Sequence, residues 1–123
     1  MRVLVTASRK MADRDVVWDA LDHLYTQWLK RRRPGERFVV MHGGAPGGDS
    51  IADAWTRQGH PHVVPDKVEA DWELLGLFAG PERNGRMVAK GPDVVLAFPR
   101  GIAKGTRDCM KQARAAGIPV HQL

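Results

Sequence analysis

Short apolar runs rich in β-branched residues alternate along the chain with longer segments whose apolar residues recur at helical spacing. The runs that predict strands are Arg2–Thr6, Arg37–Met41, His62–Pro65, Asp93–Phe98 and Ile118–His121. Regular alternation of strands and helices is typical of a parallel sheet whose right-handed crossovers place helices on both faces. A chain of 123 residues has the length of one domain. We therefore predict a single α/β domain over residues 1–123, with three α/β/α layers and a five-stranded, mainly parallel sheet.

Four helices are predicted between these strands. Their expected ranges are 13–33 with Asp13 as N-cap, 48–58, 80–90 with Gly80 as cap and Pro81 at the first position, and 106–116. The segment Asp66–Gly76 is interpreted as a loop that contains one helical turn. The first helix owes its expected buried stripe to apolar residues at helical spacing, namely Val17, Leu21, Leu24, Tyr25 and Trp28.

The charge balance narrows the class of partner. A net charge of +5 and a pI near 9.9 suit an anion, either nucleotide phosphate or nucleic acid. The densest basic run, Lys30–Arg33, ends the first predicted helix, where cations complement the helix dipole and extend into solvent. A nucleic-acid contact is the alternative for this run. We favour the solvated interpretation, because no aromatic residues are interleaved with a basic strand face.

Cysteine usage and hydropathy indicate a cytoplasmic protein. One cysteine, Cys109, excludes an internal disulfide and is compatible with a reducing compartment. No apolar run reaches the roughly 18 residues that a membrane span requires. No signal peptide is visible, since Met1 leads directly into a predicted strand. The remaining histidines lack metal-ligand spacing, so we expect no metal; these are His23, His60, His62 and His121.

A glycine-rich loop between the second strand and the second helix is the clearest candidate for a ligand site. It reads His42-Gly43-Gly44-Ala45-Pro46-Gly47-Gly48-Asp49. Glycines allow close backbone approach, and the first N–H groups of a helix lack helical partners, so such a junction can cradle phosphate. Asp49 is interpreted either as a cap or as a contact to a ribose hydroxyl. His42 either lines the pocket or is packed beneath it.

Other loops are expected at the same edge, because ligands of such sheets bind outside the carboxyl ends of the strands. Thr6, Ser8 and Arg9 lie at the end of the first predicted strand, where hydroxyls and a guanidinium suit phosphate; the alternative is a surface Arg with a turn-forming Ser. Trp72 is interpreted either as a stacking platform for a base or as core. The remaining candidates for ligand contact are Arg83 and Asn84, and, in the loop before the last helix, Pro99, Gly101, Gly105 and Thr106. Gly105 and Thr106 open that helix and offer a second anion cradle, or serve as caps alone.

Five short motifs occur in an order that resembles a known family. They are Val5-Thr6-Ala7-Ser8-Arg9, the glycine-rich loop, Ala70-Asp71-Trp72, Ala79-Gly80-Pro81-Glu82-Arg83-Asn84 with Met87, and Ala97-Phe98-Pro99 with Gly105-Thr106. Together they resemble the YspA-like, YpsA-related branch of the SLOG superfamily over nearly the whole chain. The resemblance implies a Rossmann-like domain that binds nucleotides or nucleotide-derived ligands. Some relatives are ligand sensors, and others are LOG-type phosphoribohydrolases that cleave N-glycosidic bonds.

The enzymatic relatives place an Arg in a Glu-Arg-Lys-x-x-Met helix and a Glu in Pro-Gly-Gly-x-Gly-Thr-x-x-Glu. The resemblance makes Arg83 the counterpart of the catalytic Arg. The second motif departs: its turn has become Pro99-Arg100-Gly101, and Cys109 occupies the position of the Glu. Asp108 lies one residue earlier, about 100° round the helix. A carboxylate stabilises the positive charge that develops on the ribose during cleavage, so its loss counts against that activity. Cys109 itself lies on an apolar helix face and is interpreted as a buried structural thiol.

The resulting expectation is binding of a nucleotide or nucleotide-derived molecule without turnover, and without a cofactor. The alternative is a phosphoribohydrolase that uses Arg83 with a substitute carboxylate from Asp49, Glu82 or Asp108. A second alternative is a basic nucleic-acid-binding module. By resemblance, relatives pair through helices, so a homodimer is expected.

Overall fold

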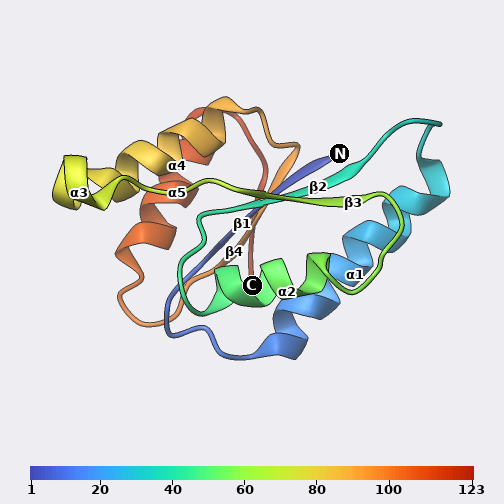
Figure 1. The fold of residues 1–123 in the computed structure, drawn as a ribbon, viewed down its shortest axis with the longest axis horizontal. Helices are drawn as coiled ribbons and strands as arrows, with labels where there is room; N and C mark the ends of the chain where they lie inside the picture. Colours follow the sequence, from blue (N-terminus) through green and yellow to red (C-terminus); the bar gives the residue numbers. More distant parts are fainter.

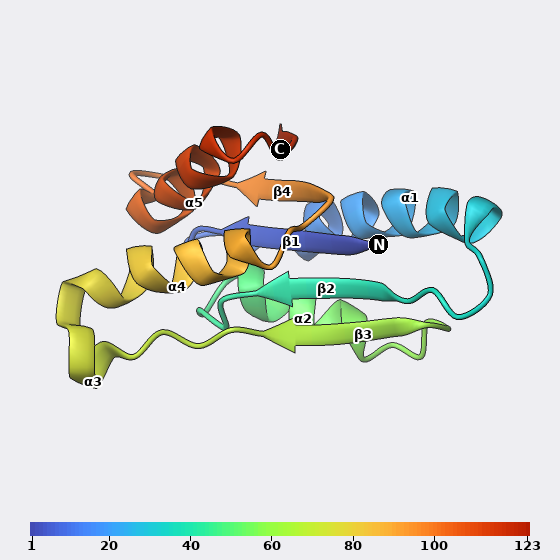
Figure 2. The same cartoon turned by 90° about the horizontal axis from the view of Figure 1, so that it is seen from above.

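The computed structural model describes residues 1–123 and contains one five-stranded sheet. The strands are β1 (Arg2–Ala7), β2 (Phe38–His42), β3 (Val63–Lys67), β4 (Val94–Phe98) and β5 (Val120–Gln122). They lie in the order β3-β2-β1-β4-β5, and every neighbouring pair is parallel. Figure 2 shows β1, β2, β3 and β4 side by side with the same direction. The predicted three-layer α/β fold with a parallel sheet is confirmed.

Helices cover both faces of the sheet (Figure 1). The helices α1 (Arg14–Arg31) and α2 (Gly48–Thr56) cover one face, and α4 (Ala79–Ala89) and α5 (Lys104–Ala115) cover the other. A short helix α3 (Trp72–Leu75) and a 3₁₀ turn η1 (Gly76–Phe78) project from one end of the molecule. No helix combines the length and apolar character needed to cross a membrane.

Alternating side chains of the central strands pack into two separate hydrophobic cores, one on each face of the sheet. On β1, Val3 and Val5 pack with residues of α1 and α2, whereas Leu4 packs with residues of α4 and α5. Successive strand residues point to opposite faces, so a strand that is covered on both sides must be apolar throughout. This explains why Val3–Val5 of β1 and the whole of β4 are apolar, and both strands lie inside the sheet.

Several element bounds differ from those predicted. Helix α4 begins at Ala79, because α3 and η1 lead into it without a break; Gly80 is therefore no cap, and Pro81 is the third helical residue. Proline is tolerated there, since its missing N–H still falls in the first turn. Helix α5 begins at Lys104, two residues before the predicted start. Strand β3 extends through Pro65, which an edge strand accepts.

Candidate functional site

The carboxyl ends of β1, β2 and β4 open into a pocket of about 520 Å³. It is lined by the loops that follow these strands, by Trp72 of α3, and by the starts of α4 and α5. The lining residues are Thr6, Ala7, Ser8, Arg9, Lys10, Gly43, Gly44, Ala45, Pro46, Trp72, Gly80, Arg83, Asn84, Met87, Arg100, Ile102, Ala103, Lys104, Gly105 and Thr106. Segments more than 90 residues apart in the sequence therefore meet at one edge of the sheet, as the parallel topology predicts.

The pocket is strongly cationic. Five of its lining residues carry a positive charge, namely Arg9, Lys10, Arg83, Arg100 and Lys104, and no aspartate or glutamate lines it. A concave surface with charges of one sign concentrates its field and attracts the opposite charge. The site is therefore suited to a small anion.

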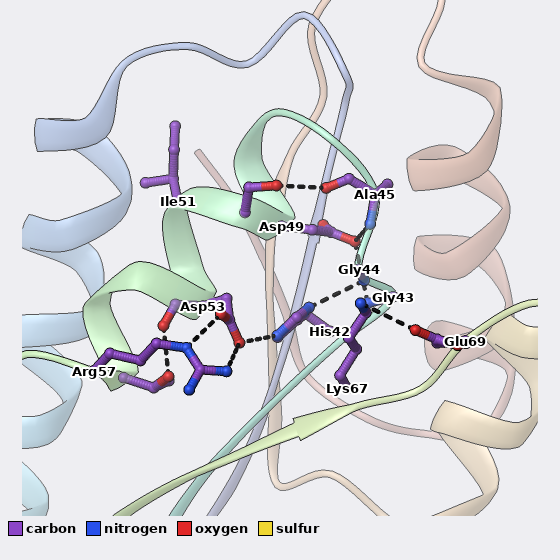
Figure 3. Close-up of polar contacts among 12 residues, drawn as sticks. His42, Gly43, Gly44, Ala45, Asp49, Ile51, Asp53, Arg57, Lys67 and Glu69 are labelled. Atoms are coloured by element: carbon purple, nitrogen blue, oxygen red, sulfur yellow. Dashed lines mark hydrogen bonds and ion pairs between the residues drawn. The ribbon is translucent and has the colours of Figure 1, made fainter.

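In the pocket-lining part of the glycine-rich loop, the backbone N–H groups of Gly43, Gly44 and Ala45 donate to side chains of the protein (Figure 3). The Asp49 carboxylate accepts the N–H of Gly43 at 3.1 Å and that of Ala45 at 3.3 Å through Oδ2, and the N–H of Gly44 donates to Nδ1 of His42 at 3.0 Å. Phosphate cradles need N–H groups that point outward without partners. The surface that Gly43 and Gly44 give to the pocket thus offers backbone, but not free backbone donors.

The His42 side chain links this loop to helix α2. It is 1% exposed and outside the pocket lining. Because Nδ1 accepts from Gly44, the ring hydrogen lies on Nε2, which donates to Asp53 at 3.0 Å. Arg57 donates to the same Asp53 carboxylate at 2.8 Å, and this bond, with that from His42, lowers the pKa of Asp53 despite partial burial. His42, Asp53 and Arg57 form a brace behind the loop.

Asp49 is neither the cap of its helix nor part of the pocket lining. The N-cap of α2 is Gly47, and Asp49 is the second helical residue, 4% exposed. Burial raises the pKa of its carboxyl, although the nearby His42, the Ala45 N–H and Arg83 act in the opposite direction. Its Oδ1 has no hydrogen-bond partner. Its function in the fold is to hold the two backbone N–H groups of the loop.

The second pair of glycines in the loop permits close packing. Gly47 has φ +88°, and a Cβ there would lie 2.7 Å from the carbonyl oxygen of Arg9. A Cβ on Gly48 would collide with that of Ala7. These glycines let the start of α2 press against the end of β1, and neither lines the pocket. Packing accounts for both glycines, and their contact with a ligand stays a prediction.

Arg83 connects helix α4 to the glycine-rich loop. Its Nη1 donates to the carbonyl of Gly43 at 2.8 Å, and its Nε donates to Oδ1 of Asn84 at 3.1 Å. Asn84 in turn donates to the carbonyl of Gly105 and to Asp108 on α5. Arg83 is thus held in place from two sides, and its Nη2 makes no hydrogen bond within the protein.

Ser8 joins the two loops on the other side of the pocket. Its hydroxyl donates to the carbonyl of Arg100 at 2.8 Å and accepts from the N–H of Lys10. Arg100 also donates to the carbonyls of Pro99 and Leu123. Ser8 is buried, and its hydroxyl already donates one hydrogen bond and accepts another within the protein. It therefore positions the loops that carry Lys10 and Arg100.

The start of α5 supplies backbone N–H groups that have no side-chain cap and lie at the pocket. Ala103, with φ +50°, precedes the helix, and no side chain caps its first turn. Lys104, Gly105 and Thr106 all line the pocket. Uncapped first-turn N–H groups and the positive end of the helix dipole favour an anion here. Cys109 lies one turn further on and is fully buried, which raises the pKa of its thiol to about 11.

The predicted candidates divide into two groups. Those brought together at the pocket are Thr6, Ser8, Arg9, Gly43, Gly44, Trp72, Arg83, Asn84, Gly105 and Thr106. Those placed outside its lining are His42, Gly47, Gly48, Asp49, Pro99 and Gly101. Sequence reasoning missed Lys10, whose only signal is its place beside Arg9 after β1. The contributions of Arg100 and Lys104 could not be decided from the sequence, because a loop cation can face either way.

None of the carboxylates considered for glycosidic cleavage reaches the pocket. Glu82 pairs with Arg86 on the exposed side of α4 at 2.8 Å. Asp108 accepts from Asn84 and from Gln112, and it does not line the pocket. Asp49 is committed to the glycine-rich loop.

The fold and the pocket at the carboxyl edge define a Rossmann-like α/β domain. Residues 1–74 match the family described as the YspA, cpYpsA-related SLOG family. The chain is also 50% identical over 123 residues to the Gene 61 protein of Mycobacterium phage D29, covering 97% of this chain and 93% of that protein. The chain therefore belongs to this SLOG family.

A solved structure shares the fold. The X-ray structure of TM1055, a structural genomics target, superposes with a TM-score of 0.65 at 19% identity and covers 97% of this chain and 71% of that one. At this identity the likeness bears on architecture alone.

Proposed function

We propose that the pocket binds a nucleotide or nucleotide-derived small molecule and retains it without turnover, as a sensor or sequestering module. The observation that carries this proposal is a cavity of about 520 Å³ that is lined by five cations and by no carboxylate. Pockets of this size accommodate small-molecule ligands. Membership of the SLOG family supports a nucleotide-related ligand.

The geometry suggests where each part of such a ligand lies. A phosphate fits the uncapped start of α5, beside Lys104 and within reach of the unpartnered Nη2 of Arg83. Trp72 is 51% exposed and lines the pocket, so its ring offers a stacking face for a base. Its edge lies against Gly80, where a Cβ would come within 3.4 Å of Cη2. Phosphate recognition is therefore assigned to α5, and base recognition to α3.

The phosphoribohydrolase alternative lacks its second chemical group at the pocket. Cleavage of an N-glycosidic bond needs a carboxylate close to the developing positive charge on the ribose. The three candidates Asp49, Glu82 and Asp108 are paired or bonded elsewhere, and Cys109 is a buried thiol with a raised pKa. Arg83 alone can bind a phosphate, so binding without turnover is the simpler proposal.

Incubation of the purified protein with a nucleotide panel tests this proposal. The panel holds nucleoside monophosphates and diphosphates, NAD and ADP-ribose, and bound and free fractions are analysed by mass spectrometry over time. We expect one nucleotide to be enriched intact. Accumulation of free base and ribose phosphate, lost in Arg83→Ala, would establish the hydrolase instead. Absence of binding across the panel would reject both.

A matched pair of variants makes the test specific to the pocket. Arg83→Ala should weaken binding by about tenfold to a hundredfold, the usual range for a hydrogen bond to a charged group. Arg86→Ala removes the same charge three residues later on the same helix, but from its exposed side outside the pocket. Equal losses in both variants would indicate a general effect of net charge.

The expected homodimer is proposed to use the segment that projects from the end of the molecule. Leu74, Leu77 and Phe78 of α3 and η1 are 77%, 91% and 79% exposed. Adjacent large apolar side chains in solvent are typical of a protein contact surface. Sedimentation of the wild type and of Leu77→Asp tests this: a dimer that the substitution converts to monomer supports the proposal, and a monomeric wild type rejects it.

A further inference from the structure

We propose that the ligand carries at least two linked phosphates, and is thus a nucleoside diphosphate, a triphosphate or a pyrophosphate-bridged nucleotide rather than a monophosphate. This inference rests on the proposed function and concerns the same pocket. Its basis is the number of the lining cations, their lack of acidic partners, and their distribution over separate chain segments.

The charge balance exceeds what one phosphate can neutralise. A phosphate monoester carries about −1.5 to −2 charge at neutral pH, against five lining cations and no lining carboxylate. Arg9, Lys10 and Lys104 form no ion pair with any acidic residue of the protein, as the ion pairs of the chain lie elsewhere. A monophosphate would leave several like charges facing one another across a concave surface, which is unfavourable. Each further phosphate removes part of that repulsion.

The cations are also spread along the edge of the sheet. Arg83 contacts the loop after β2, Lys10 follows β1, and Lys104 follows β4. Asn84 accepts from Arg83 and donates to the carbonyl of Gly105, so the Arg83 guanidinium and the start of α5 adjoin and form one cradle. A single phosphate in that cradle leaves Lys10, on the loop after β1, without an anion. A second, linked phosphate supplies one.

The cradle formed by Arg83 and the start of α5 differs in rigidity from Lys10, which indicates the order of the phosphates. Arg83 is half-buried and fixed through Gly43 and Asn84, and the backbone N–H groups at the start of α5 cannot move away. Lys10 is exposed, and its Nζ lies 3.5 Å from the position of a Cβ on Gly101, so it reaches across to the loop before α5. The first phosphate therefore occupies the fixed cradle, and the second is held by the rim around Lys10.

Titration calorimetry with matched nucleotides tests the inference. AMP, ADP and ATP, and the corresponding guanine, cytosine and uracil nucleotides, are titrated at constant ionic strength in the presence of a chelator. For the preferred base we expect the diphosphate to bind at least tenfold more tightly than the monophosphate. Equal or tighter binding of the monophosphate overturns this inference and leaves the proposed function intact. Lack of binding by every nucleotide overturns the proposed function itself.

Two variants separate a built site from general attraction of polyanions. Lys10→Gln should reduce the ratio of diphosphate to monophosphate affinity by fivefold or more. Arg31→Gln removes one charge from the basic run at the end of α1, outside the pocket, and should leave that ratio unchanged. An equal fall of the ratio in both variants would mean that the preference reflects net charge alone, and it would overturn the inference.

Discussion

The loop after β2 and the loop after β4 both lead from a strand to a helix at the same edge, yet they use their backbones in opposite ways. In the glycine-rich loop after β2, the N–H groups of Gly43, Gly44 and Ala45 already donate to Asp49 and His42. Neither α2 nor α5 has a side-chain cap, but only α5 has its first residues, Lys104 and Gly105, at the pocket. The glycine-rich loop after β2, which is the more obvious phosphate-binding candidate in the sequence, thus has no free N–H group among Gly43, Gly44 and Ala45. The free N–H groups at the pocket lie at the start of α5, after β4.

This difference shows that glycine content alone does not identify a phosphate loop. Glycine permits close approach of the backbone, but the approaching group can be another part of the same protein. At Gly47 and Gly48 that group is the end of β1, and at Gly43 it is the guanidinium of Arg83. An anion can take a backbone donor only where no internal acceptor has already taken it.

Amide hydrogen exchange should show the largest contrast between the two loops. The N–H groups of Gly43 and Gly44 are bonded to side chains in or near the core, so they should exchange only through substantial opening of the structure. The N–H groups of Gly105 and Lys104 should exchange almost freely and gain protection when a nucleotide is added. NMR-detected exchange of the free protein measures both. Fast exchange at Gly43 and Gly44 would contradict the closed-loop description.

Replacing Gly48 by alanine should destabilise the protein by about 1–3 kcal/mol, because the added methyl collides with Ala7 in a packed region. Gly105→Ala is the matched control at the start of the other helix. A Cβ there meets nothing within 4 Å, and alanine is the better helix former, so stability should be unchanged or slightly raised. Urea denaturation measures both. Similar losses in the two variants would remove the distinction between a packed and an open helix start.

The Asp49→Asn variant should reveal the buried carboxyl through pH. Burial raises the pKa of Asp49 above its ordinary 3.8. Below that pH both the folded and the unfolded state hold the proton. As the pH rises above 3.8, the unfolded state loses its proton first, so folding comes to require proton uptake and stability falls until the pH passes the folded pKa.

Asparagine has no such proton, so the stability of Asp49→Asn relative to the wild type should improve over this range. Each unit by which the pKa is raised corresponds to about 1.4 kcal/mol. Urea denaturation at several values from pH 3.5 to 7 measures the difference between the two proteins. A constant difference would show that Asp49 is not linked to folding through its proton.

Most of the fold could be predicted because it depends on local, repeated patterns. The apolar runs Val3–Val5 in β1 and Val94–Phe98 in β4 indicate strands covered on both faces, and the structure places both strands inside the sheet. The bounds that were wrong lie where tertiary context decides. Helix α4 begins before Gly80 because η1 leads directly into it.

The candidate site was predictable in its location but not in its chemistry. Parallel topology brings Ser8, Gly43, Arg83 and Gly105 to one edge whatever their side chains do. The hydrogen-bond partner of each polar group depends on differences of a few ångströms in the folded structure, and the sequence does not contain this information. Asp49 was equally compatible with a cap and with a sugar contact, and the structure gives it to the N–H groups of the loop itself.

The smallest expected effect comes from the outer end of the brace behind the glycine-rich loop. Arg57 is a solvent-exposed side chain that donates to Asp53 one helical turn away, and exposed pairs of this kind contribute little to stability. Its bond is nevertheless the main reason that the pKa of Asp53 is lowered. In Arg57→Ala the Asp53 pKa, measured by NMR titration, should rise toward its ordinary value. The stability that Asp53 contributes is present above pH 3.8 and lost as the pH falls through its folded pKa, so this acid-side loss should become smaller.

The exchange rate of the Gly44 N–H should stay unchanged, because His42 remains bonded to Asp53. A faster exchange at Gly44 in this variant would show that the closed state of the loop depends on the surface pair and not on the buried histidine.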